Sequence, residues 1–186
     1  MKSCLLSFSG GLDSLAAAIV LKDAGYHVTL GHITWLIQGT DFGQEQTKAA
    51  NVQAEVLDLP LLILGRMMFP EYSAAKYSWV PVAISTILHH AGDPLEYPAP
   101  SVQRYDSVAF GTDFLEVPEH DNHIRRWWLT AMRRYTYKGE ILYPLEGLER
   151  ADRRRIVPEH LQATTVCCYL GKSAAELCGQ CYKCLD

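Results

Sequence analysis

Apolar and polar residues follow one another along the chain in short blocks that predict strands and helices in turn. Short apolar runs are typical of buried strands, and four of them stand out: 3–8, 26–35, 59–64 and 105–114, the last running into a loop. Apolar positions at helical spacing predict helices at three places: from Leu12 to just before Gly25, over 44–56, and over 80–92.

The later part of the chain continues this pattern less regularly. Residues 122–138 carry an apolar stripe opposite arginines, 140–145 read as a short extended piece, and 149–161 as a polar helix that ends near Pro158. Strands that alternate with helices through short connections indicate a parallel sheet, because parallel neighbours need crossover connections. We therefore expect an α/β, Rossmann-like fold with helices on both faces of the sheet.

Composition narrows the class of protein without naming a function. The 186 residues are 48% hydrophobic and 20% charged, which favours a folded globular protein of one domain with a small appendage. A net charge of −4 gives no overall attraction to nucleic acid. No run approaches the ~20 apolar residues that span a membrane, and the N-terminus is too short in apolar residues for a signal peptide, so we expect a cytoplasmic protein.

The turn after the first strand has the sequence S-G-G-L-D-S, residues 9–14. It matches neither the dinucleotide loop G-x-G-x-x-G nor the Walker loop, which contains lysine. Glycines let backbone N–H groups approach an anion, serines add hydroxyl donors, and a helix N-terminus carries about half a positive charge. The segment therefore favours a phosphate site built without lysine. The alternative is an ordinary strand-to-helix turn in which Asp13 only stabilises the helix dipole.

Five of the six cysteines crowd the last twenty residues. Cys178, Cys181 and Cys184 form C-x-x-C-x-x-C, and Cys167 and Cys168 precede them. Four thiolates at such spacing suit a closed, structural zinc site with Zn–S distances of ~2.3 Å. On spacing alone either Cys167 or Cys168 fits as the first ligand. A redox or disulfide tail and an iron–sulfur cluster are the alternatives.

Both ends of the chain resemble known sequences. S-G-G-L-D-S resembles the signature of the PP-loop ATP pyrophosphatases, which cleave ATP between the α and β phosphates and transfer AMP to a substrate oxygen. The ending CYLG…CGQCYKC looks like that of one family among them, the 7-cyano-7-deazaguanine synthases. DFGQ, VAFGTDF and PLEGLERADRRRIV are similar to further family segments, with Arg150 where lysine is usual. The family's Arg-Asn pair is absent from YSWVPVAIST, and this departure bears on the substrate more than on ATP.

The resemblance implies an adenine-nucleotide α-hydrolase-like fold, with an ATP pyrophosphatase domain over 1–163 and a zinc-binding segment over 164–186. It assigns ATP binding to Ser9, Gly10, Gly11, Asp13, Ser14, Gly111 and Arg150. It assigns catalysis to Asp13, Ser14 and Asp113, and substrate contacts to Phe42 and Gln44. Trp79 is a further substrate candidate, because it lies in a loop after a strand end, where ligands bind in open α/β sheets; ordinary packing is the alternative. The resemblance assigns Cys168, Cys178, Cys181 and Cys184 as ligands of a structural zinc ion. The motif comparison selects Cys168 over Cys167 as the first ligand. Mg²⁺ would accompany ATP.

The implied reaction converts 7-carboxy-7-deazaguanine and ammonia to 7-cyano-7-deazaguanine through adenylated intermediates. Three alternatives stay open: the same ATP chemistry on another acceptor, including a protein terminus or a nucleic-acid base; a nucleic-acid binder that uses the basic and aromatic segments at 125–138 and 153–155; and an inactive zinc-containing binding module. The acidic balance speaks against nucleic acid as a partner, and the oligomeric state stays open, a homodimer included.

Overall fold

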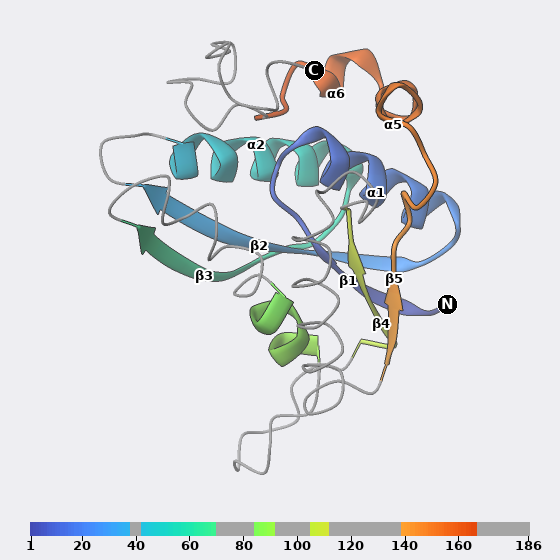
Figure 1. The fold of residues 1–186 in the computed structure, drawn as a ribbon, viewed down its shortest axis with the longest axis horizontal. Coiled ribbons are helices and arrows are strands. Elements are labelled where there is room, and N and C mark those ends of the chain that lie inside the picture. Colours follow the sequence, from blue (N-terminus) through green and yellow to red (C-terminus); the bar gives the residue numbers. More distant parts are fainter. Residues whose placement is uncertain (38–41, 70–83, 92–104, 112–138, 167–186) are drawn as a thin grey trace.

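The computed structural model describes residues 1–37, 42–69, 84–91, 105–111 and 139–166. The strands of this part of the chain form one sheet in the order β3-β2-β1-β4-β5 (Figure 1). Their bounds are β1 Ser3–Ser7, β2 His27–Ile37, β3 Leu61–Phe69, β4 Ser107–Phe110 and β5 Glu140–Leu142. Each pair of neighbouring strands is parallel. The parallel α/β sheet expected from the sequence is thus confirmed.

The helices connect these strands as the hydrophobic pattern predicts, with differences at their ends. Their bounds are α1 Leu12–Asp23, α2 Phe42–Leu57, α5 Arg150–Ile156 and α6 Glu159–Gln162, and residues 84–91 are also helical. After α1 the chain turns at Gly25, whose φ of +81° lies in the left-handed region that glycine tolerates. The helical stripe expected at 122–138 lies outside the described residues.

Two sequence predictions were wrong in their bounds, and proline accounts for part of each. The strand expected at 59–64 begins only at Leu61, because the Leu59 N–H bonds back to the Ala54 carbonyl of α2 and Pro60 has no N–H to give. The polar helix expected over 149–161 is two helices. α5 ends at Ile156, and Pro158 serves as the N-cap of α6.

Helices cover both faces of the sheet, as expected (Figure 1). On one face, side chains from β1 such as Leu6 join α1, α2 and α5 in one buried apolar cluster. On the other face, Leu5 packs with Ile87 and Leu88 of the helix at 84–91 in a second cluster. Successive residues of β1 point to opposite faces, so a strand buried on both sides reads as the continuous apolar run seen in the sequence.

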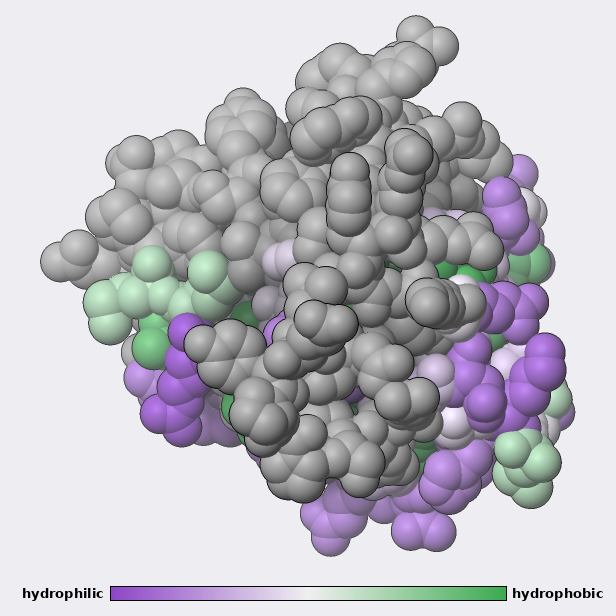
Figure 2. Space-filling model, turned by 90° about the horizontal axis from the view of Figure 1, so that it is seen from below, coloured by the Kyte–Doolittle hydropathy of each residue, from purple (hydrophilic) through white to green (hydrophobic). Residues whose placement is uncertain are grey.

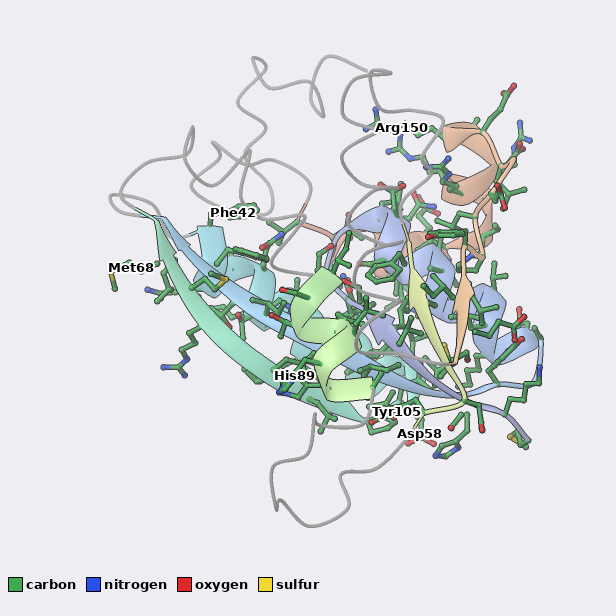
Figure 3. All side chains as sticks on the ribbon, turned by 60° about the horizontal axis from the view of Figure 1, so that its bottom comes forward. Phe42, Asp58, Met68, His89, Tyr105 and Arg150 are labelled. Atoms are coloured by element: carbon green, nitrogen blue, oxygen red, sulfur yellow. The ribbon has the colours of Figure 1, made fainter. Side chains whose placement is uncertain are left out.

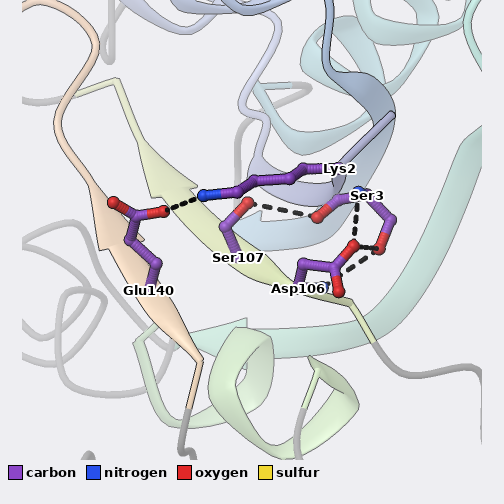
Figure 4. A network of polar contacts seen from close by, with 5 residues as sticks. All are labelled: Lys2, Ser3, Asp106, Ser107 and Glu140. Atoms are coloured by element: carbon purple, nitrogen blue, oxygen red, sulfur yellow. Dashed lines mark hydrogen bonds and ion pairs between the residues drawn. The ribbon is translucent and has the colours of Figure 1, made fainter.

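The amino-terminal ends of β1, β4 and β5 are joined by polar contacts (Figure 4). The Ser3 N–H and hydroxyl each lie 2.8 Å from the Asp106 carboxylate, and the Ser107 hydroxyl donates to the Ser3 carbonyl at 3.1 Å. Lys2 pairs with Glu140 of β5 at 3.3 Å. The two hydrogen bonds from Ser3 hold the pKa of the Asp106 carboxyl below its ordinary value. The contacts fix the strands at the end opposite to the glycine loop.

β3 is one of the two edge strands of the described sheet and exposes apolar side chains. Leu62, Ile63 and Met68 are all more than two fifths exposed. Apolar atoms also gather at the margin of the face shown in Figure 2, next to polar ones. Among the described residues, the helices are too short or too polar to cross a membrane.

Candidate functional site

The glycine loop lies between the end of β1 and the first turn of α1. Several hydrogen bonds within the loop are long: the Gly11 N–H donates to Ser9 Oγ at 3.3 Å, and the Ser9 N–H to Ser14 Oγ at 3.2 Å. The Ser14 hydroxyl donates to the Gly11 carbonyl at 3.0 Å. N–H···O bonds are usually about 2.9–3.0 Å long, so these donors are weakly held. Ser9 is exposed, so an anion oxygen can reach its N–H and hydroxyl from solvent, whereas Gly11 and Ser14 are buried behind it.

The second half of the site comes from the end of β4. Ser7 of β1 is paired with Phe110 of β4, so the residues after these two strands lie side by side. A Cβ on Gly111 would meet the Ser14 Cα at 2.9 Å and the Asp13 carbonyl oxygen at 3.0 Å. Only glycine therefore fits against the first turn of α1 without a shift of backbone.

The strand order places this contact at a topological switch point. From β1 the chain continues to β2 and β3 on one side of the sheet, and β4 and β5 are added later on the other side. In open α/β sheets, ligands bind at the carboxyl ends of the strands at such a point. The loop of residues 9–14 and Gly111 occupy this position.

Asp13 lies in the first turn of α1 and is paired with a buried arginine. Its Oδ1 lies 3.6 Å from Nη1 of Arg153, whose side chain is 1% exposed, whereas that of Asp13 is 32% exposed. Nε and Nη2 of Arg153 both donate to the Leu148 carbonyl, at 2.9 and 2.7 Å. The arginine is thus anchored by the turn before α5 and directed at α1. The carboxylate of Asp13 is balanced by a cation that the loop motif does not contain.

A buried histidine supports the loop from β2. His32 is fully buried; its Nδ1 lies 2.8 Å from the Phe8 carbonyl, just before the loop, and its Nε2 lies 3.0 Å from Thr47 Oγ1 of α2. Burial lowers the pKa of His32, and the Phe8 carbonyl opposes this only in part. The ring is therefore neutral at pH 7, donates from Nδ1 to Phe8, and acts here as a structural link between β1, β2 and α2.

Two predicted substrate residues begin α2, with different surroundings. Phe42 is buried, and Figure 3 shows it near the tips of β2 and β3, while Asp58 and Tyr105 lie at the other end of the sheet. Gln44 is exposed. Between them, a Cβ on Gly43 would lie 1.8 Å from the Trp35 carbonyl oxygen, so glycine is required where α2 starts against β2.

The remaining predicted residues are less closely placed or lie elsewhere. Arg150 is exposed at the start of α5, away from the sheet (Figure 3). Asp113, Trp79 and the cysteines Cys168, Cys178, Cys181 and Cys184 lie outside the described residues. Within the described ranges, no three His, Cys, Asp or Glu side chains gather closely enough to hold a metal ion. The boundary at 163/164 stays a prediction.

Sequence reasoning missed two buried polar residues beside the loop. Arg153 is the first of three consecutive arginines, and such a run gives no sign of which one is buried. Gln53 is fully buried in α2 and donates from Nε2 to the Gly10 carbonyl at 3.2 Å. Its position carried a signal: with Ala49, Ala50 and Ala54 it falls on the small-residue face of its helix, where an amide is out of place.

No known family model matches the sequence, and no curated protein matches it. The structure is similar to that of a predicted subunit of tRNA methyltransferase from Methanocaldococcus jannaschii, with a TM-score of 0.52 and 18% identity, over 84% of this chain and 75% of that one. It is also similar to the U34-tRNA thiolase NcsA from Methanococcus maripaludis, solved with its 4Fe–4S cluster, with a TM-score of 0.55 and 17% identity. That match covers 83% of this chain but only 55% of the thiolase. At such identities the likeness shows the fold, a Rossmann-like α/β sheet.

Proposed function

We propose that the chain binds ATP at residues 9–14, transfers AMP to an acceptor oxygen and releases pyrophosphate. The observation that carries this proposal is the position of the loop. The loop lies at the switch point of the sheet, beside the residue after β4. It offers weakly held N–H and hydroxyl donors, an exposed Ser9 and a helix N-terminus. An anion binds there without any lysine, because backbone N–H groups and the helix dipole supply the attraction.

The chain's own residues divide the work in this proposal. Ser9, Gly10, Gly11 and Ser14 bind the leaving pyrophosphate, and Gly111 lets the end of β4 lie directly against the first turn of α1 beside them. Asp13 and Asp113 would hold the Mg²⁺ that accompanies ATP, and the exposed Arg150 would attract the triphosphate. The protein contributes position and charge stabilisation, which are the main terms in phosphoryl and nucleotidyl transfer.

The first candidate acceptor is the carboxylate of 7-carboxy-7-deazaguanine. The carboxylate oxygen attacks the α-phosphate to give an acyl adenylate and pyrophosphate, and ammonia then displaces AMP to form the amide. A second ATP adenylates the amide oxygen, and loss of AMP leaves the nitrile. Trp79 would stack on the ring and Gln44 would contact its edge, whereas Phe42 is buried and does not offer a face to the ring in this structure. The cysteine-rich ending of the sequence supports this acceptor.

The second candidate acceptor is a tRNA base. Two of the similar structures are a predicted subunit of tRNA methyltransferase and a U34-tRNA thiolase, and the Arg-Asn pair of the synthases is absent from this sequence. Adenylation of a base oxygen uses the same loop and releases the same pyrophosphate. The two candidates therefore share the ATP half of the reaction and differ only in the acceptor.

One experiment tests both candidates. The protein is incubated with ATP, Mg²⁺ and ammonium, with either 7-carboxy-7-deazaguanine or unmodified tRNA, and the products are identified by mass spectrometry. AMP and pyrophosphate together with the nitrile support the first acceptor, and release that depends on tRNA supports the second. Pyrophosphate release that depends on neither acceptor contradicts both candidate acceptors. No pyrophosphate release under any of these conditions contradicts the ATP reaction itself. Ser14→Ala should abolish release, whereas Ser85→Ala, in the distant helix at 84–91, should not.

The C-terminal cysteines are proposed to hold structural zinc through Cys168, Cys178, Cys181 and Cys184. The similar thiolase contains a 4Fe–4S cluster, so iron is the rival metal. Elemental analysis of protein purified with and without oxygen distinguishes them: zinc in both preparations supports the proposal, and iron with sulfide in the anaerobic one contradicts it. Cys181→Ser should lose the metal, and Cys4→Ser, at a buried site in β1, should keep it.

A further inference from the structure

The peptide between Gly10 and Gly11 is held in one orientation by groups outside the loop. The Gly10 carbonyl accepts the Val166 N–H at 3.1 Å and Nε2 of Gln53 at 3.2 Å. Gln53 Nε2 also lies 3.1 Å from Thr164 Oγ1 and 3.4 Å from the Thr164 carbonyl. Helix α2 and the segment 164–166 thus close on the carbonyl from two sides.

This orientation decides which way the neighbouring N–H points. In a trans peptide the C=O and the N–H point in opposite directions. With the Gly10 carbonyl directed into the protein, the Gly11 N–H is directed to the other side, where it meets Ser9 Oγ. A reversed peptide would present a carbonyl oxygen to the anion instead of a donor. Gly10 has φ +79° and tolerates such reversal more readily than other residues do, so its conformation needs an external restraint.

Gln53 provides that restraint at a cost in hydrogen bonding. Its side chain is fully buried, and Oε1 has no hydrogen-bond partner among the described residues. A buried amide with an unsatisfied oxygen destabilises the fold, and an apolar side chain of the same shape would avoid the penalty. Gln46 of the same helix also has a buried oxygen without a partner among the described residues, so the contact of Nε2 with the loop is what distinguishes Gln53.

We propose that Gln53 is a positioning residue of the phosphate loop, which together with residues 164–166 keeps the Gly11 N–H directed at the pyrophosphate of ATP. The inference rests on the proposed function, because it concerns the same loop. It adds a residue 42 positions away from Gly11 in the sequence, on another helix, to the determinants of anion binding.

The test compares affinity with stability. Gln53→Met keeps the volume, removes the donor and also removes the unsatisfied oxygen. We expect its affinity for inorganic pyrophosphate and for Mg²⁺–ATP, measured by calorimetry, to fall about tenfold, which corresponds to about 1.4 kcal/mol. Its urea midpoint should stay equal or rise. Asn51→Leu is the matched control, because this exposed amide of the same helix donates to the Thr47 carbonyl away from the loop.

Each outcome decides the proposal. Unchanged affinity in Gln53→Met, or an equal fall in Asn51→Leu, overturns it, and so does a fall in affinity that only follows a loss of stability. If Gln53→Met does not fold, Thr164→Val decides the question, because it removes one acceptor of Nε2. It should lower the affinity for pyrophosphate by a few fold while the protein stays folded under the conditions of the assay. Failure of the wild-type protein to bind ATP or pyrophosphate would instead contradict the proposed function itself.

Discussion

The ion pair between Asp13 and Arg153 makes an asymmetric prediction about stability. The two residues differ in exposure: the guanidinium is buried, whereas about a third of the carboxylate side chain is exposed. Asp13→Asn takes this carboxylate away from a buried cation. Arg153→Met removes the buried cation and leaves a carboxylate that water reaches. We therefore expect Asp13→Asn to destabilise the protein more than Arg153→Met, although arginine is the larger side chain.

The size of the effect follows from the geometry. Two unit charges 3.6 Å apart interact with about 5 kcal/mol at an effective dielectric constant of about 20. Water at the exposed part of Asp13 and the polar amide of the new asparagine reduce the loss, so about 2–3 kcal/mol is expected for Asp13→Asn. Arg153→Met leaves the Leu148 carbonyl without two donors, which costs about 1–2 kcal/mol.

Urea unfolding of the nucleotide-free protein measures both changes, and the double variant completes the cycle. Asp13→Asn with Arg153→Met should be less destabilised than the two single changes together, because the residues are in contact. Arg155→Met, on the same helix with an exposed partner, should cost under about 0.5 kcal/mol. The reasoning fails if Arg153→Met costs more than Asp13→Asn, or if the two effects add.

Three further predictions concern other parts of the molecule. Gly111→Ala should lower ATP affinity in calorimetry by about tenfold or more, whereas Gly65→Ala, where a Cβ meets nothing within 4 Å, should not; equal behaviour refutes the steric argument. Hydrogen bonds from Ser3 lower the pKa of Asp106, so the charged carboxylate stabilises the fold above its ordinary pKa of about 3.9, and this stabilisation is lost as pH falls through the lower folded pKa. Asp106→Asn should therefore flatten the decline of the urea midpoint below about pH 4. An unchanged slope contradicts this prediction. Burial raises the pKa of Cys4 to about 11, so peptide mapping should find it unalkylated by iodoacetamide at pH 8 until urea is added, and equal labelling without urea would refute it.

Local patterns predicted the elements of this fold well where burial is uniform. β1 and β4 are buried on both faces, so their apolar runs identify them, and α1 ends where Gly25 provides a left-handed turn. The β3 bounds were harder to predict, because the strand extends along the edge of the sheet to Phe69 with exposed apolar residues that no alternation marks. Pairing with β2, a tertiary interaction, extends it.

The candidate site likewise contains residues that local sequence patterns predict and residues that only tertiary contacts identify. The motif of residues 9–14 and the glycine after β4 were visible in the sequence, because a turn and a close backbone approach require particular residue types. Arg153 and Gln53 were not predicted from the sequence, because each acts through a contact with a residue far away in the chain. The local sign of Gln53 was a polar residue among the alanines of the buried face of α2, and it shares this feature with Gln46.

The contacts of the loop also explain how the proposed phosphate site would work without lysine. Among the described residues, the acid in the motif is balanced by Arg153, so in this proposal the backbone donors and the dipole of α1 would attract the anion without an opposing carboxylate. The peptide that presents the Gly11 donor is held by Gln53 and by the N–H of Val166. Both Arg153 and Val166 belong to the last described segment, 139–166. The motif is therefore local in sequence, but its charge and its shape depend on a part of the chain more than a hundred residues later.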